Sequence, residues 1–166
     1  MLISLIHPSR GRPELPLKEA SDIINKSSGK HKLEYIICVD TSDPKLPEYK
    51  RLFGGTFSQI FSNVVLKVFD SKNCVQSLNN GAKISTGDIL IYVSDDFIFP
   101  QNWDQLIVEK TKGITDWVLW VRDGIQDRIS TGIIMDRIYY NRDKFLYHPD
   151  FFSMYADDFL TWLAKQ

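Results

Sequence analysis

The sequence has few cysteines and no cysteine-based metal signature. Its two cysteines, Cys38 and Cys74, form no C-x-x-C pair and no histidine-paired metal spacing. Cys38 lies inside the apolar run 36–39, which predicts a buried free thiol. A reducing compartment fits this pattern.

The sequence also lacks an apolar stretch long enough to cross a membrane. Residues 1–6 are apolar, but they have no basic flank and are too short for a signal peptide. We therefore expect no transmembrane segment and a cytoplasmic location, in solution or peripheral at the inner membrane face.

Neither sign of charge is in excess, because 20 Lys and Arg stand against 21 Asp and Glu. Nucleic-acid-binding domains normally carry a basic excess, so no nucleic-acid partner is expected. The aromatic content of 13%, with nine glycines and seven prolines in 166 residues, argues for an ordered globular protein. This length suits one domain with a sizeable core.

Apolar segments alternate with helical patterns along the chain. The expected strands are 2–6, 33–39, 64–69, 89–93, 116–121 and 132–135. The expected helices are 17–26, 73–85, 103–112, 136–143 and 155–165. Continuous apolar strands between helices indicate a mostly parallel sheet flanked by helices, so we predict a single α/β domain over 1–166.

Polar clusters follow three of these strands, at 9–12, 40–43 and 94–96. In mostly parallel sheets the ligand crevice lies beyond the carboxyl ends of the strands. We therefore expect these three segments, which are distant in sequence, to meet at one site.

Two adjacent carboxylates, Asp95 and Asp96, follow the fourth strand. They repel each other, and a divalent cation such as Mg²⁺ or Mn²⁺ would supply the counter-charge through oxygen ligands. A metal there would stabilise a diphosphate leaving group. The competing interpretation is a solvated acidic pair, or a cap for the helix near Trp103.

Asp40, Arg10 and Arg12 are candidate nucleotide-binding residues. A carboxylate at position 40 can accept hydrogen bonds from a nucleobase or a ribose hydroxyl, and the arginines can hold a phosphate or a base. The alternatives are a turn residue before Pro44 and solvated arginines. The sequence has no G-x-G-x-x-G and no Walker P-loop, so dinucleotide binding and P-loop phosphoryl transfer lack their markers.

A second acidic pair, Asp157 and Asp158, lies between apolar and aromatic residues. Desolvation and mutual repulsion favour proton uptake there, as a general base for a hydroxyl requires. The alternative is a pair at a helix N-terminus, favoured by the helix dipole. His148 is a candidate metal ligand, although a lone loop histidine is more often neither ligand nor catalyst.

Several segments, taken in order, carry a family resemblance. Segment 3–13 (ISLIHPSRGRP) looks like a first strand followed by a P-T-R-N-R-P loop, and segment 39–43 (VDTSD) is similar to V-D-D-G-S-x-D. Segment 79–81 (NNG), with Gly87 six residues on, is similar to R-N-x-G followed by A-x-G.

The remaining segments continue the pattern. Segment 91–97 (IYVSDDF), with Pro100 and Trp103, is similar to L-D-x-D…P…W, and segments 135–137 and 155–159 look like later S-R and E-D elements. From about residue 1 to its end, the chain resembles a short form of the family 2 glycosyltransferases of the GT-A fold, in the nucleotide-diphospho-sugar transferase superfamily.

This resemblance implies an inverting, metal-dependent glycosyltransferase, with a UDP-linked sugar as donor and an unidentified sugar, lipid or protein as acceptor. Asp96 would be the principal ligand of Mn²⁺ or Mg²⁺. Asp158 would be the general base, with Asp157 in the preceding acidic position. The implied nucleotide-binding residues are Pro8, Ser9, Arg10, Arg12, Asp40, Ser42, Asn79 and Asp95.

The chain departs from the family pattern in three places. Ser94 replaces the first acidic residue of D-x-D, and Leu78 stands where an arginine is common. The chain also stops soon after Asp158, so we expect a nucleotide-binding half over 1–100 and a truncated acceptor-side half over 101–166. A non-catalytic nucleotide- or glycan-binding protein on the same scaffold is the alternative. Oligomeric state stays open.

Overall fold

The computed structural model describes residues 1–54, 63–122 and 124–166. The strands are β1 (Leu2–Ser9), β2 (Lys32–Asp40), β3 (Val64–Phe69), β4 (Ile89–Tyr92), β5 (Val118–Trp120) and β6 (Ile133–Asp136). The helices are α1 (Glu14–Asn25), α2 (Leu46–Gly54), α4 (Cys74–Ile84), α5 (Trp103–Lys110), α6 (Arg137–Asp143) and α7 (Ala156–Leu163). Every expected strand and helix is present; strand 64–69 has the expected ends, and the ends of the others are shifted.

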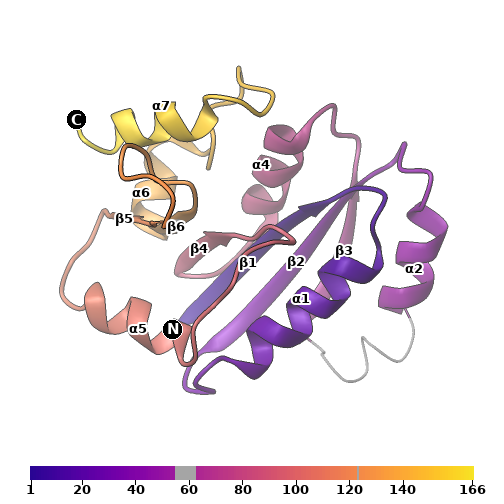
Figure 1. Cartoon of the computed structure of the whole chain (residues 1–166), viewed down its shortest axis with the longest axis horizontal. Helices are drawn as coiled ribbons and strands as arrows, with labels where there is room; N and C mark the ends of the chain where they lie inside the picture. The colour runs from indigo at the N-terminus through magenta and orange to yellow at the C-terminus, as the bar shows by residue number, and fades with distance from the viewer. Residues whose placement is uncertain (55–62, 123) are drawn as a thin grey trace.

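One six-stranded sheet, in the order β3-β2-β1-β4-β6-β5, organises the chain. The pairs β3–β2, β2–β1 and β1–β4 are parallel, and β6 runs antiparallel to both of its neighbours, β4 and β5. The arrows of β1, β2 and β3 point to the same edge of the sheet (Figure 1). The prediction of a single α/β domain with a mostly parallel sheet is confirmed.

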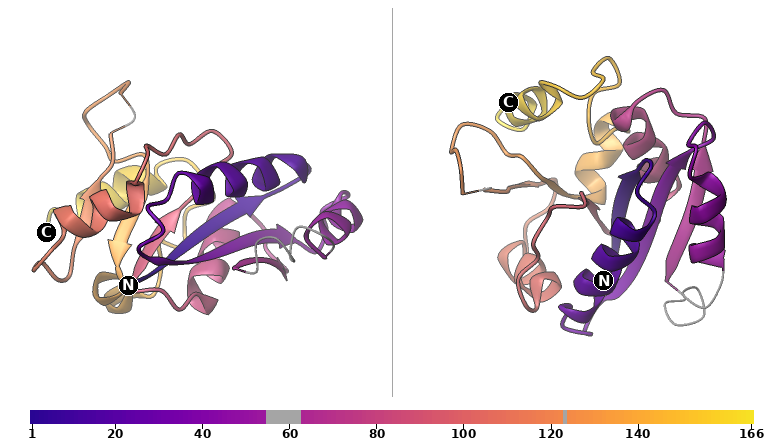
Figure 2. Two further views of the ribbon diagram at one scale, coloured as in Figure 1. Left: turned by 90° about the horizontal axis from the view of Figure 1, so that it is seen from below. Right: turned by 45° about the vertical axis from the view of Figure 1, so that its right-hand side comes forward.

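Helices cover both faces of the sheet, and each face has its own apolar cluster. Residues of α1, α2 and α5 pack with Leu5 and Tyr35 on one face. Residues of α4, α6 and α7 pack with Ile6 and Ile36 on the other (Figure 2). Because successive strand residues point to opposite faces, strands buried on both sides consist mostly of apolar residues.

Two glycines allow backbone segments to approach the sheet closely. A Cβ on Gly81 of α4 would lie 2.5 Å from the Cys38 sulfur and 2.6 Å from Cγ2 of Ile6. A Cβ on Gly87 would lie 2.7 Å from the backbone nitrogen of Ser4. The two glycines of the 79–87 motif are therefore needed for packing against β1 and β2.

Cys38 is fully buried and free, as predicted, and Cys74 is also free. Burial raises the pKa of the Cys38 thiol.

β1 extends through Pro8 to Ser9, beyond the predicted end at residue 6. The pairing of β1 with β4 stops at Ile6, whereas its pairing with β2 continues to Ser9. One side of β1 is therefore an edge at Pro8, where a missing N–H is tolerated. Helix α2 was not predicted, because it buries only Tyr49 and Phe53.

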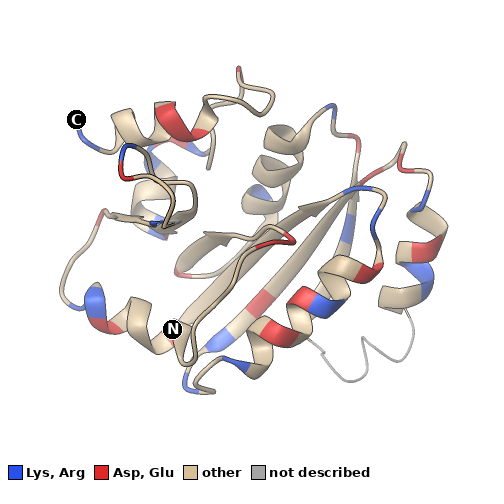
Figure 3. Ribbon diagram, in the orientation of Figure 1, with Lys and Arg blue, Asp and Glu red and all other residues tan. Residues whose placement is uncertain are grey.

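Acidic and basic residues are interspersed along α1 and α2 (Figure 3). None of the helices in the described part of the chain is long and apolar enough to span a membrane.

Candidate functional site

A pocket of about 480 Å³ lies at the carboxyl edge of the parallel strands. We call it the strand-edge pocket. It lies between the loop after β1, the end of β2 and the segment that leads into α4. It is lined by Pro8, Ser9, Arg10, Arg12, Asp40, Ser42, Asp70, Ser71, Lys72, Asn73, Cys74 and Ser77. Six of these, from Pro8 to Ser42, are predicted nucleotide-binding residues, so the first two polar clusters do converge.

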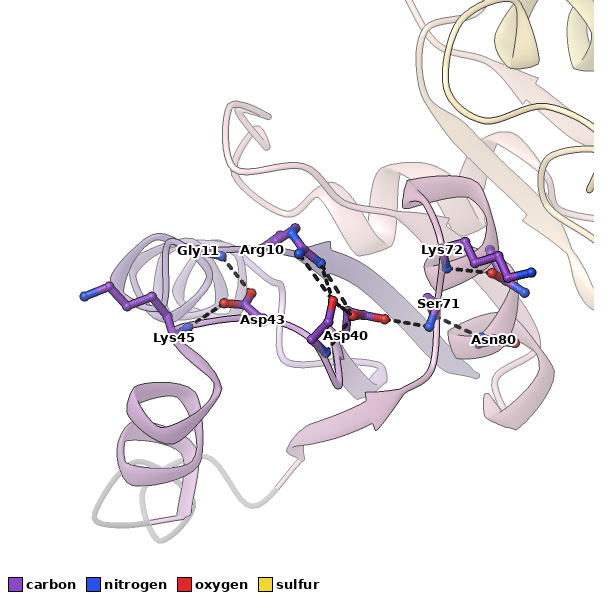
Figure 4. Close-up of polar contacts among 10 residues, drawn as sticks. Arg10, Gly11, Asp40, Asp43, Lys45, Ser71, Lys72 and Asn80 are labelled. Atoms are coloured by element: carbon purple, nitrogen blue, oxygen red, sulfur yellow. Dashed lines mark hydrogen bonds and ion pairs between the residues drawn. The ribbon is translucent and has the colours of Figure 1, made fainter.

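The carboxylate of Asp40 joins the segments around this pocket (Figure 4). Its Oδ1 accepts hydrogen bonds from the backbone N–H of Ser42 at 2.7 Å and from the Ser42 hydroxyl. Its Oδ2 accepts the N–H of Ser71 at 2.6 Å, and Arg10 Nη1 lies 3.5 Å from Oδ1. The pKa of Asp40 is lowered, chiefly by the Ser42 hydroxyl, despite burial, with the two N–H groups and Arg10 adding to it.

Asn80 on α4 supports the same side of the pocket. Its side-chain amide donates to the Ser71 hydroxyl at 3.1 Å, and the Ser71 N–H in turn donates to Asp40 (Figure 4). Asn73 caps α4 by accepting the N–H of Gln76 at 2.8 Å. The role of Asn80 could not be predicted from the sequence, because only the fold brings it next to Ser71.

The loop after β1 is held by the segment after β2. The N–H of Gly11 donates to Asp43 Oδ2 at 2.7 Å, and Asp43 Oδ1 accepts the N–H of Lys45 (Figure 4). The Tyr49 hydroxyl contacts the Ser9 hydroxyl at 2.7 Å and accepts the N–H of Arg12 at 3.1 Å. Gly11 has a φ of +71°, which suits glycine. The pocket wall is therefore fixed by hydrogen bonds from buried residues.

Asp95 does not line the strand-edge pocket. Its side chain is 8% exposed, with Oδ1 3.0 Å from His7 Nε2 and Oδ2 2.9 Å from Arg12 Nη2. Arg12 lines the pocket, so Asp95 forms an ion pair with a residue of the pocket wall. His7 was not among the predicted site residues.

Asp96 lines a second, mostly apolar pocket of about 640 Å³ between β4, β6 and α5. Phe97, Phe99 and Trp103 are among its walls. The structure therefore places the two adjacent carboxylates in different surroundings.

A divalent cation was predicted near Asp96. Within residues 1–54, 63–122 and 124–166, no three His, Cys, Asp or Glu side chains are grouped as metal ligands. Mg²⁺ is commonly held by one or two carboxylates together with substrate phosphates, so a single carboxylate is chemically adequate when the donor supplies the other oxygens. Asp96 is one such carboxylate, and it lines the apolar pocket rather than the strand-edge pocket.

Asp157 and Asp158 are the second and third residues of α7. Asp157 Oδ1 accepts the N–H of Asp158 at 3.0 Å, and the Asp158 side chain is 35% exposed. Arg128 Nη2 lies 3.6 Å from Asp158 Oδ1. The pair therefore lies in the first turn of a helix, where the helix dipole favours negative charge.

His148 lies among aromatic rings. Its ring centroid is 5.2 Å from that of Phe145 and 5.1 Å from that of Phe159. Its Nδ1 accepts the N–H of Asp150 at 3.3 Å. Among the described residues, no ion pair or hydrogen bond joins His148 to Asp96.

The side chain of Asn79 is directed away from the strand-edge pocket. It bonds to the backbone of Leu146 and Tyr147, at distances of 2.7 to 3.3 Å. Asn79 therefore ties α4 to the segment after α6.

Solved structures that are similar to this chain include two glycosyltransferases. One is the mannosyltransferase PcManGT from Pyrobaculum calidifontis, in complex with GDP-Man and Mn²⁺, with a TM-score of 0.69 and 17% identity over 94% of this chain. Another is S. aureus TarS 1–349, with a TM-score of 0.63 and 14% identity over 99% of this chain. The chain has the fold of GT-A-type glycosyltransferases. The predicted fold resemblance is confirmed.

The chain spans about half the length of these structures, 49% of the mannosyltransferase and 55% of TarS. No family model matches the sequence, and a search of curated proteins finds no significant match.

Proposed function

We propose that this protein is a glycosyltransferase that moves a sugar from a nucleoside-diphosphate sugar to an acceptor hydroxyl. The observation that carries this proposal is the strand-edge pocket. On a GT-A-type sheet, it gathers Asp40, Ser42 and Arg10 beyond the carboxyl ends of β1 and β2. Open α/β sheets bind ligands at this edge.

The donor nucleotide would occupy the strand-edge pocket. Asp40 would accept hydrogen bonds from the base, for which we propose uracil, or from the ribose, and Arg10 and Arg12 would contact the phosphates. The arginine side chains are each 59% exposed, so their donors are accessible to a ligand. In this account residues 1–100 form the nucleotide-binding half and residues 101–166 the acceptor-side half.

Asp96 would hold a divalent cation together with the donor diphosphate. Such a cation, when bound, neutralises the negative charge that develops on the leaving group. The structurally similar mannosyltransferase PcManGT was solved in complex with GDP-Man and Mn²⁺, which supports testing this ion first.

Asp158 would act as the general base. It would take the proton of the acceptor hydroxyl as that oxygen attacks the anomeric carbon of the donor sugar. The bond from the anomeric carbon to the diphosphate oxygen breaks in the same displacement, the nucleoside diphosphate leaves with the electron pair, and the configuration inverts.

The test measures release of nucleoside diphosphate from a panel of UDP- and GDP-sugars in the presence of Mn²⁺. Because the natural acceptor is unidentified, water serves as the acceptor. We expect turnover of at least one UDP-sugar. Asp158→Asn should lower kcat by about 100-fold or more, as loss of a general base does, with nucleotide affinity unchanged. Asp143→Asn, at an exposed carboxylate at the end of α6, is the matched control and should behave as the wild type.

A non-catalytic binding protein on the same scaffold is the second candidate. It is favoured by Ser94 in place of the first acidic residue and by the lack of a three-ligand cluster among the described residues. Tight nucleotide binding without turnover of any donor would support it over the enzyme.

A further inference from the structure

A histidine is completely buried in the core, on the face of β1 that packs against α1. His7 has no exposed surface, and its side chain points to the same face as Leu5 because strand residues alternate. Its diagonal neighbour on this face is the fully buried Tyr35 of β2, which pairs in register with Leu5. Buried ring nitrogens and hydroxyls require hydrogen-bond partners, so both side chains need an explanation.

The two side chains form a chain of hydrogen bonds that ends on Asp95. The Tyr35 hydroxyl lies 2.9 Å from His7 Nδ1, and His7 Nε2 lies 3.0 Å from Asp95 Oδ1. Both contacts have ordinary hydrogen-bond lengths. This hydrogen-bond chain links positions 7, 35 and 95, which are far apart in sequence.

Only one assignment of protons gives every proton in the Tyr35–His7–Asp95 hydrogen-bond chain an acceptor. If the Tyr35 O–H donates to Nδ1, then Nε2 carries the ring proton and donates it to the Asp95 carboxylate. If Nδ1 carried a proton instead, the Tyr35 O–H would need another acceptor. Among the described residues it has no hydrogen-bond partner except His7, and the nearby buried Glu19 Oε1 accepts no hydrogen bond.

The hydrogen-bond chain holds Oδ1 of Asp95, and Arg12 forms an ion pair with Oδ2, which accepts no hydrogen bond. Arg12 Nη2 lies 2.9 Å from Asp95 Oδ2, and Arg12 lines the strand-edge pocket. A carboxylate held from both sides cannot rotate freely. It keeps Arg12 at the pocket wall and keeps the turn after β4, which carries Asp96, in one position.

We infer that His7 is a positioning residue, which holds Asp95 through its Nε2–H while Tyr35 fixes the histidine tautomer. This inference rests on the proposed function for its consequence, because the orientation of Asp95 and Arg12 matters for donor binding. The hydrogen-bond chain itself can be tested without any ligand.

The first test is nitrogen-15 NMR of the imidazole rings at neutral pH. The chain has three histidines, so His7 is assigned by elimination with His31→Gln and His148→Gln. We expect a protonated Nε2 and an unprotonated Nδ1. In Tyr35→Phe, the Nδ1 nitrogen loses its hydrogen-bond donor. Its chemical shift should therefore move to the value of an unprotonated ring nitrogen that accepts no hydrogen bond. A proton on Nδ1 in the wild type would overturn the inference.

The second test is calorimetric titration of UDP with Mn²⁺ into the wild type and Tyr35→Phe. Tyr35→Phe removes one oxygen and keeps the ring, so the core should stay packed. We expect nucleotide affinity to fall by roughly tenfold, the usual effect of losing one buried hydrogen bond in a charged network. The matched control is Tyr139→Phe, whose buried hydroxyl has no hydrogen-bond partner among the described residues and should leave affinity unchanged.

The two tests separate the possible failures. If the wild type binds no nucleotide, the proposed function fails, and NMR still decides whether His7 holds Asp95. If the wild type binds and folded Tyr35→Phe binds equally well, the positioning role of the chain is refuted.

Discussion

Asn79 of α4 binds the backbone of Tyr147, 68 positions further along the chain, at both its N–H and its carbonyl. The amide Nδ2 donates to the Tyr147 carbonyl at 2.7 Å, and Oδ1 accepts the N–H of Leu146 at 2.9 Å and that of Tyr147 at 3.3 Å. Leu146 is fully buried, so these groups are shielded from water. One side chain therefore connects α4 to the segment before α7.

Asn79→Ala should lower the free energy of unfolding by about 1–3 kcal/mol, because it leaves buried backbone groups without partners. Urea denaturation measures this loss. We expect UDP affinity to stay unchanged, since the Asn79 side chain bonds away from the strand-edge pocket. A fall in affinity without a fall in stability would instead support the nucleotide-binding role predicted from the sequence.

Gly81→Ala should also destabilise the fold. The new methyl group would lie within 2.6 Å of Ile6 and Cys38 in the core, and overpacking of this kind costs about 1–3 kcal/mol. Gly54→Ala is the matched control, because a Cβ on Gly54 meets no atom within 4 Å. Equal stability of the two variants would refute the close packing of α4 on the sheet.

Asp40→Asn should weaken both the fold and nucleotide binding. The pKa of Asp40 is lowered in the folded state, so its charged form stabilises the protein. This contribution is complete above the unfolded value of 3.8 and is lost as the pH falls through the lower folded pKa. Urea denaturation from pH 6 to pH 2 should therefore show a smaller acid-induced loss in Asp40→Asn. An unchanged pH profile would contradict this role.

Glu19→Gln should have the opposite effect. Burial raises the pKa of Glu19, and the charges of Asp22 and Asp95 raise it further, against the opposing charge of Lys26. The charged form therefore destabilises the folded state above the folded pKa, and this penalty disappears below the unfolded value of 4.5. We expect Glu19→Gln to be more stable than the wild type at pH 7, with the gain vanishing at low pH. A less stable variant at pH 7 would show that the Glu19 charge is compensated.

Much of the fold could be predicted because β1, β2 and β4 are largely buried on both faces and contain mostly apolar residues. Since parallel strands end at a common edge of the sheet, the sequence pattern also predicts that Arg10 and Asp40 lie close together. β6 was predicted as a strand, but its antiparallel direction leaves no mark in four residues.

The buried contacts of the site could not be predicted, because they join residues that are distant in sequence. Asp95 and Asp96 look equivalent in the sequence, yet one bonds to His7 and the other lines an apolar pocket. The position of His7 after an apolar strand gave no sign of its partners. Asn79 and Asn80 are adjacent, but one stabilises the segment after α6 and the other supports Ser71.

The most direct test of the donor site is calorimetric titration of UDP and of GDP, with and without Mn²⁺, repeated on Asp96→Asn. The account predicts Mn²⁺-dependent binding of UDP to the wild type and loss of that binding in Asp96→Asn. Failure of the folded wild type to bind either nucleotide would contradict the account and leave a glycosyltransferase fold without a donor site.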